Sequence, residues 1–167
     1  MAESTDRREL RRRQYLSLGL GELVAAGVFG GVATWYGAYL GWQGRAAVAG
    51  AVGPLVLVLV AAGFYWLLAR RWVGVAPMPR ALALAYLGLG LLAVLLLAGG
   101  LVVTLVAAPS TAWLVLLLLA WGFGVVELVN CSLRRLAFPV TRWWSGGVQG
   151  RTPQLARDVR AGLAERP

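Results

Sequence analysis

The chain has 167 residues, of which 59% are hydrophobic, and its mean hydropathy is +0.71. A soluble domain of this length has no interior large enough for so much apolar surface, so the composition favours a membrane protein. The formal net charge is +9, and every basic residue is an arginine. Arginines beside apolar spans set membrane topology, so we expect no nucleic-acid partner. With no histidine and only Cys131, we expect no metal, no cofactor and no enzymatic activity.

Residues 1–14 form a polar, basic segment, which we expect to be a cytoplasmic N-terminus. Asp6 followed three residues later by Glu9 resembles a capping box. The first transmembrane helix is therefore predicted to begin outside the bilayer.

Four long apolar stretches follow, and each exceeds the roughly 20 residues that cross a hydrocarbon core of about 30 Å. Their short connections make successive helices antiparallel neighbours. We therefore predict an all-α fold, a four-helix transmembrane bundle over residues 15–137. A cleaved signal peptide is the alternative for the first stretch, but its length and Glu22 argue against it. The predicted spans are 16–42, 46–68, 81–107 and 111–133.

The arginines are distributed unevenly between the two sides of these spans. All of them except Arg45 lie in the N-terminal segment, in the connection between the second and third spans, or after the fourth span. The positive-inside rule therefore places both termini in the cytoplasm and the protein in the cytoplasmic membrane. Trp and Tyr favour the headgroup zone, so we expect membrane-interface anchors among the tryptophans near span ends. The candidate anchors are Trp42, Trp72, Trp113, Trp143 and Trp144.

Residues 138–167 are predicted to form a cytoplasmic basic tail. Pro153 favours a helix start, and Leu155, Val159 and Leu163 recur four residues apart. This pattern predicts a C-terminal amphipathic helix that binds anionic inner-leaflet lipids. A solvated tail is the alternative.

Two acidic residues lie inside the spans, Glu22 in the first and Glu127 in the fourth. A charged group at the centre of a bilayer helix costs about 2.5–3.5 kcal/mol on insertion scales, so such residues indicate a partner or a function. Both are expected at similar depth in the cytoplasmic half, where Asn130 and Arg134 share a helix face with Glu127. The predicted polar cluster is therefore Glu22, Glu127, Asn130 and Arg134, with Arg70, Arg71 and Arg135 as further ion-pair partners.

The cluster has two interpretations. It either forms an internal ion-pair network that holds the helices in register, or it is a proton or cation site. The first fits a non-enzymatic structural or accessory protein that acts through helix–helix, protein or lipid contacts, and this is the function we favour. The second fits a proton- or cation-coupled transporter or channel, by analogy with the small multidrug transporters, which also have four spans and a glutamate in the first. Arginine-closed carboxylates would support the first interpretation, and a cavity the second.

Glycines in the first span bear on partners. Gly27 and Gly31 have the spacing that lets helix backbones approach closely. This face can pack within the bundle, against another membrane protein, or between copies of the chain, so a homo-oligomer is one expectation.

The last span and the tail also carry a likeness to known proteins. Glu127 and Asn130 near the end of the span, Arg135 and Leu136 after it, and residues 155–160 match a recurrent pattern. In these features the chain resembles small four-span bacterial membrane proteins of actinobacterial type, to which no activity is assigned. The resemblance implies a multi-pass membrane location.

Overall fold

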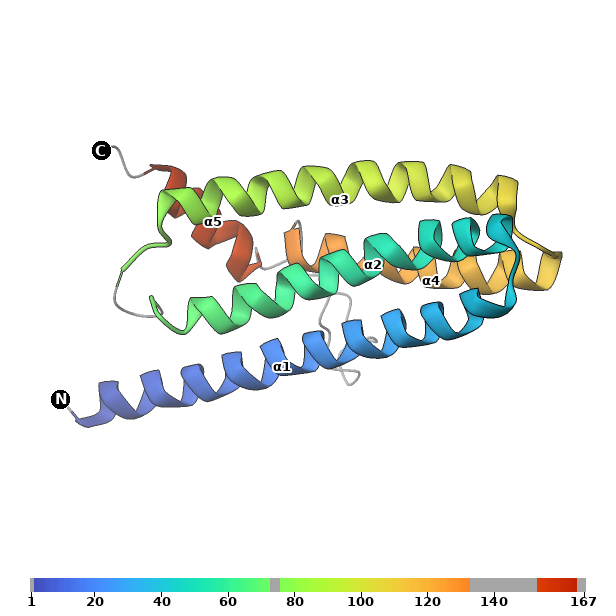
Figure 1. The fold of residues 1–167 in the computed structure, drawn as a ribbon. Coiled ribbons are helices and arrows are strands. Elements are labelled where there is room, and N and C mark those ends of the chain that lie inside the picture. The colour runs from blue at the N-terminus through green and yellow to red at the C-terminus, as the bar shows by residue number, and fades with distance from the viewer. Residues whose placement is uncertain (1, 73–75, 133–152, 165–167) are drawn as a thin grey trace, which may run out of the picture.

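The computed structural model describes residues 2–72, 76–132 and 153–164, with side chains from residue 8 onward. In this part of the chain the regular elements are all helices (Figure 1). One end of the bundle holds the two tight connections, residues 40–41 and 108–110, and is called the turn end. The other holds the start of α1, the end of α2, the start of α3, and α5, and is called the terminal end. The helices are α1 (Ala2–Tyr39), α2 (Trp42–Ala69), α3 (Arg80–Ala107), α4 (Thr111–Ser132) and α5 (Gln154–Ala164).

The first four helices are long and apolar enough to cross a membrane, which confirms the predicted all-α fold with four candidate spans. The first of them begins at Ala2, so the basic N-terminal segment is part of the same helix. Its 38 residues extend about 57 Å at 1.5 Å per residue, well beyond the hydrocarbon core. It ends at Tyr39, three residues before the predicted end, and Trp42 instead begins α2 after Gly41.

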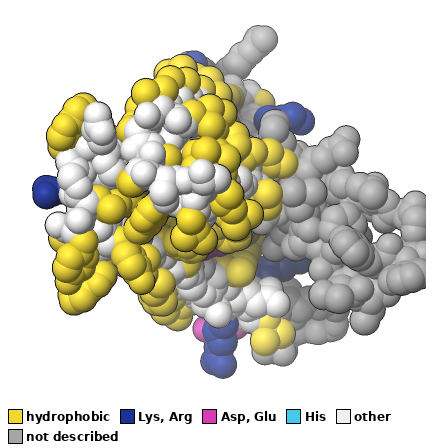
Figure 2. Space-filling view, turned by 90° about the vertical axis from the view of Figure 1, so that its right-hand side faces the viewer, with side chains coloured by type: hydrophobic (Ala, Val, Ile, Leu, Met, Phe, Trp, Pro, Cys, Tyr) yellow, Lys and Arg dark blue, Asp and Glu magenta, His cyan; other side chains and the backbone are white. Residues whose placement is uncertain are grey.

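The second helix is the centre of the bundle. It packs against α1, α3 and α4, and 56% of its most apolar window is buried inside the protein, against 22% or less in each of the other three. The other three therefore expose most of their apolar side chains. Hydrophobic side chains cover much of the surface visible in Figure 2, with few charged ones among the described residues. Lipid is the solvent that suits such a surface.

The crossing of α2 and α3 depends on a proline. Pro54 lies inside α2 and has no backbone N–H, so the carbonyl of Gly50, four residues earlier, lacks its intrahelical donor. The oxygen of that carbonyl occupies the position that a Cβ would take at Gly100 of α3. Backbone Cα–H groups form weak hydrogen bonds with such carbonyls, and the lack of a side chain allows the contact. The two glycines therefore let α3 cover a carbonyl that would otherwise face hydrocarbon.

Side-chain hydrogen bonds to backbone carbonyls support the same packing. Thr104 is fully buried, and its hydroxyl donates to the carbonyl of Ala47 on α2 at 3.3 Å. The indole N–H of Trp121 on α4 donates to the carbonyl of Leu97 on α3 at 2.8 Å. Interhelical bonds of this kind contribute about 0.6 kcal/mol each in membranes. They tie α3 to α2 and to α4.

We predict that Gly100→Ala destabilises the bundle by about 1–3 kcal/mol, because the new methyl group would meet the Gly50 carbonyl, a backbone atom with no rotamer to change. Gly99→Ala is the matched control, since a Cβ at Gly99 meets nothing within 4 Å. The measurement is thermal unfolding of both variants in detergent micelles. Equal melting temperatures for the two variants would contradict the Gly50–Gly100 contact.

Candidate functional site

A cavity with some polar groups in a mostly apolar wall lies in the half of the bundle nearer the terminal end, and it is called the polar cavity. Its volume is about 140 Å³, enough for several water molecules. Glu22 of α1 and Asn130 of α4 contribute polar groups to its wall, and the first residues of α5 close it on one side. The lining residues are Leu18, Glu22, Ala62, Tyr65, Trp66, Asn130, Cys131, Pro153, Gln154 and Leu155.

Glu22 is half-buried, and its carboxylate lies close enough to that of Glu127 for the two to repel each other electrostatically. The sequence predicted that these two residues lie at similar depth, and in the structure Glu22 of α1 and Glu127 of α4 both lie in the half of the bundle nearer the terminal end. Cys131, one turn further along α4, donates its thiol hydrogen to Glu127 Oε2 at 3.9 Å. The acidic pair is therefore connected to the cavity by Glu22 directly and by Cys131 beside Glu127.

The acidic pair belongs to a longer seam between α1 and α4, which is made by side chains. Toward the turn end, Phe29 lies 5.8 Å from Phe123 between ring centroids, and Tyr36 lies 5.9 Å from Trp113 in an edge-to-face arrangement. The backbones of α1 and α4 approach each other far less closely than either approaches α2. The glutamates are thus the polar members of a series of facing residues whose other pairs are aromatic.

The predicted arginine partners fall into two groups. Arg134 and Arg135 lie outside the described residues. Arg71 is exposed, and the Nε atom of Arg70 is buried without a hydrogen-bond partner among the described residues. Within the same part of the chain, no ion pair joins Arg70 or Arg71 to either glutamate. The arginine-closed network therefore stays a prediction.

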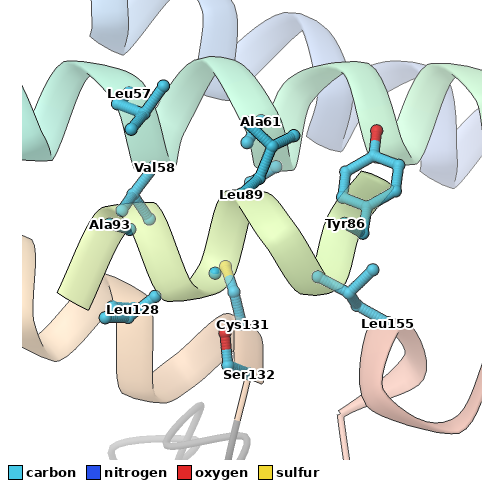
Figure 3. Close-up of a pocket in the computed structure, with 12 residues that line it drawn as sticks. Leu57, Val58, Ala61, Tyr86, Leu89, Ala93, Leu128, Cys131, Ser132 and Leu155 are labelled. Atoms are coloured by element: carbon cyan, nitrogen blue, oxygen red, sulfur yellow. The ribbon is translucent and has the colours of Figure 1, made fainter. Parts of the chain in front are cut away.

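A second, smaller cavity of about 40 Å³ lies on the other side of Cys131 (Figure 3). Leu57, Val58 and Ala93 line it, and Tyr86 of α3 and Leu155 of α5 lie at one side. Its wall is mostly apolar, so it suits no charged ligand. Among the described residues, no group of three His, Cys, Asp or Glu side chains could hold a metal ion.

The C-terminal helix docks on the terminal end of the bundle through Asp158. One of its carboxylate oxygens, Oδ2, accepts hydrogen bonds from the Tyr65 hydroxyl at 2.8 Å and from the Trp72 indole N–H at 3.2 Å. The other, Oδ1, accepts one from Gln154 at 2.7 Å. Leu155 and Val159 of the predicted apolar face pack against the cluster formed by Tyr65, Ala69, Trp72, Met78 and Ala83.

Sequence reasoning missed this docking contact. Asp158 is separated from Tyr65 by 93 residues, and the only signal was an acid within an otherwise basic helix. The third predicted member of the apolar face, Leu163, is exposed. Among the predicted anchors, Trp42 is 78% exposed and Trp113 is half-buried, whereas Trp72 is only 8% exposed and contacts α5. Trp143 and Trp144 lie outside the described residues.

We predict that Asp158→Ala undocks α5, because the two hydrogen bonds that join it to Tyr65 and Trp72 are lost and bonds to charged groups contribute about 1.5–3 kcal/mol each. Trypsin cleavage after Arg157 and Arg160, mapped by mass spectrometry, should become faster in the variant. Glu9→Ala removes an equal charge from the exposed surface of α1 and should leave the rate unchanged. Unchanged cleavage in Asp158→Ala would show that this carboxylate does not hold the helix.

Comparison with known proteins found no relative of this chain. The chain matches no protein-family model, no curated protein and no solved structure. The likeness to small bacterial four-span proteins stays a prediction, and residues 133–152 within it lie outside the described part of the chain. Functional inference therefore rests on the acidic pair, the polar cavity and the docked helix.

Proposed function

We propose that the protein is a multi-pass protein of the cytoplasmic membrane, with both termini inside, that passes protons or small cations through the Glu22–Glu127 pair without enzymatic catalysis. The observation that carries the proposal is that Glu22 of one span and Cys131 of another, the hydrogen-bond partner of Glu127, line the same cavity, which is large enough for water. Four helices of membrane-spanning length and composition support the setting. The uneven distribution of arginines supports the orientation.

The physical argument concerns the charge of the pair. Two carboxylates that lie near each other repel, and a proton or a monovalent cation bound to one of them relieves this repulsion. Among the described residues, no arginine forms an ion pair with Glu22 or with Glu127. The amide of Asn130 on the cavity wall offers a polar group next to the pair. A site that gains and loses one positive charge is the minimal element of a proton or cation pathway.

We expect proteoliposomes that contain the wild-type protein to dissipate an imposed proton or sodium gradient, and Glu22→Gln and Glu127→Gln to reduce that flux at least ten-fold. The amide keeps the shape of the side chain but cannot carry the charge. Glu9→Gln, on the exposed part of α1, is the matched control and should keep wild-type flux. Equal flux in wild type and both glutamine variants, or none in any of them, would rule out these residues as a transport site.

A second candidate is an accessory role through helix–helix contacts, the function favoured by the sequence. One observation supports it. Gly27 and Gly31 lie on an exposed part of α1, and a Cβ at either position meets nothing within 4 Å. Close packing within the bundle therefore does not explain this pair. A second copy of the chain, packed along the same face, is the partner we propose for this function.

For this candidate we expect Gly27→Leu with Gly31→Leu to reduce oligomer formation, because the larger side chains prevent close backbone approach. Multi-angle light scattering in detergent measures the mass of the complex. The matched control is Gly88→Leu with Gly99→Leu, two positions on α3 that also face open space. A wild-type monomer, or equal oligomer mass in both double variants, would contradict a homo-oligomer built on α1.

A further inference from the structure

A groove lies between α1 and α5 at the terminal end, and it is called the α1–α5 groove. Neither Glu22 nor Glu127 lines it. Arg11 and Gln14 of α1, Trp66 of α2, and Gln154 and Arg157 of α5 contribute to its wall. Its volume is about 680 Å³, large enough for a phosphodiester head group. Most of the surface that lines it is polar.

The described residues that line the groove carry positive charge from two arginines. Arg11 and Arg157 are both exposed, and no acidic side chain is among the described residues that line the groove. The nearest acid in sequence, Asp158, already accepts hydrogen bonds from Tyr65, Trp72 and Gln154. Arg157 donates one guanidinium hydrogen bond to Gln154 at 2.9 Å, which orients it along the groove wall. Two guanidinium groups from separate helices therefore line one space, and none of the described residues places an acidic side chain in its wall.

The surroundings of the groove match the boundary of a bilayer. Tyr15 and Trp66 also line it, and their rings pack at 5.0 Å between centroids. Rings of this kind favour the headgroup zone. Leu18, at the groove's edge, and Leu20, further along α1, are 39% and 50% exposed. An amphipathic ligand could place its charged end on the arginines and its acyl chains along this apolar side of α1.

We propose that the α1–α5 groove binds the phosphate of an anionic phospholipid between Arg11 and Arg157. Basic pockets between membrane helices are the usual recognition elements for such head groups, and arginine pairs suit phosphate because each guanidinium presents several N–H donors. The site exists only while Asp158 holds α5 against the bundle, because α1 supplies one arginine and α5 the other. The inference is independent of ion passage through Glu22 and Glu127.

Native mass spectrometry of the detergent-solubilised full chain, titrated with phosphatidylglycerol, tests the proposal. We expect Arg11→Ala with Arg157→Ala to weaken retention of this lipid by about 25-fold, roughly five-fold for each arginine removed. The matched control is Arg71→Ala with Arg160→Ala, which removes two exposed arginines that do not line the groove. It should bind as the wild type does. Phosphatidylcholine, which has the same phosphate but no net charge, should be retained weakly by all three proteins.

Further variants and a competing anion distinguish a lipid site from general charge attraction. Asp158→Ala should weaken phosphatidylglycerol binding as well, although it makes the chain more basic, because it separates the two arginines. Equal losses in the groove variant and its control would mean general charge attraction and would overturn the proposal. Inorganic phosphate that displaces the lipid at equal concentration would instead assign the groove to a free anion and would overturn the lipid assignment. Thermal unfolding of each variant in the same detergent shows that it is folded before it is compared.

Discussion

The carbonyl of Gly50 is the constraint on which the arrangement of the bundle depends. Pro54 removes its hydrogen-bond donor in the middle of an apolar helix, and hydrocarbon offers no replacement. Gly100 of α3 covers that oxygen at a distance that only a residue without a side chain allows. A second close approach, Gly19 of α1 against Gly63, holds the opposite part of α2, so that three helices pack around one.

The central position of α2 determines where polar groups can meet. Because α1 and α4 both pack against it, they face each other across a seam that only long side chains bridge. Near the turn end these side chains are aromatic, and nearer the terminal end they are Glu22 and Glu127. Docking of α5 through Asp158 then closes the polar cavity beside the acids and completes the α1–α5 groove. One packing scheme therefore produces both candidate sites.

The sequence was sufficient for the four long apolar helices, because hydropathy depends on local composition alone. It could not identify α2 as the central helix, since four similarly apolar helices give no signal for which one is buried in protein and which in lipid. The spacing of Gly27 and Gly31 predicted a close helix contact in the first span, whereas Gly50 and Gly100 form the close contact between α2 and α3. The role of Asp158 could not be predicted either, because its partners Tyr65 and Trp72 are far from it in sequence and contact it only in the folded chain.

The seam between α1 and α4 has a mechanical consequence. Helices joined through glycine contacts behave as a stiff unit, because backbone against backbone leaves no soft degree of freedom. Phe29, Phe123, Tyr36 and Trp113 bridge the seam by rotatable side chains instead. We therefore expect side-chain rotations to change the contact between α1 and α4 more readily than the crossing of α2 and α3. Glu22 and Glu127 lie on the same two helices, so their separation depends on side-chain conformation rather than on a backbone contact.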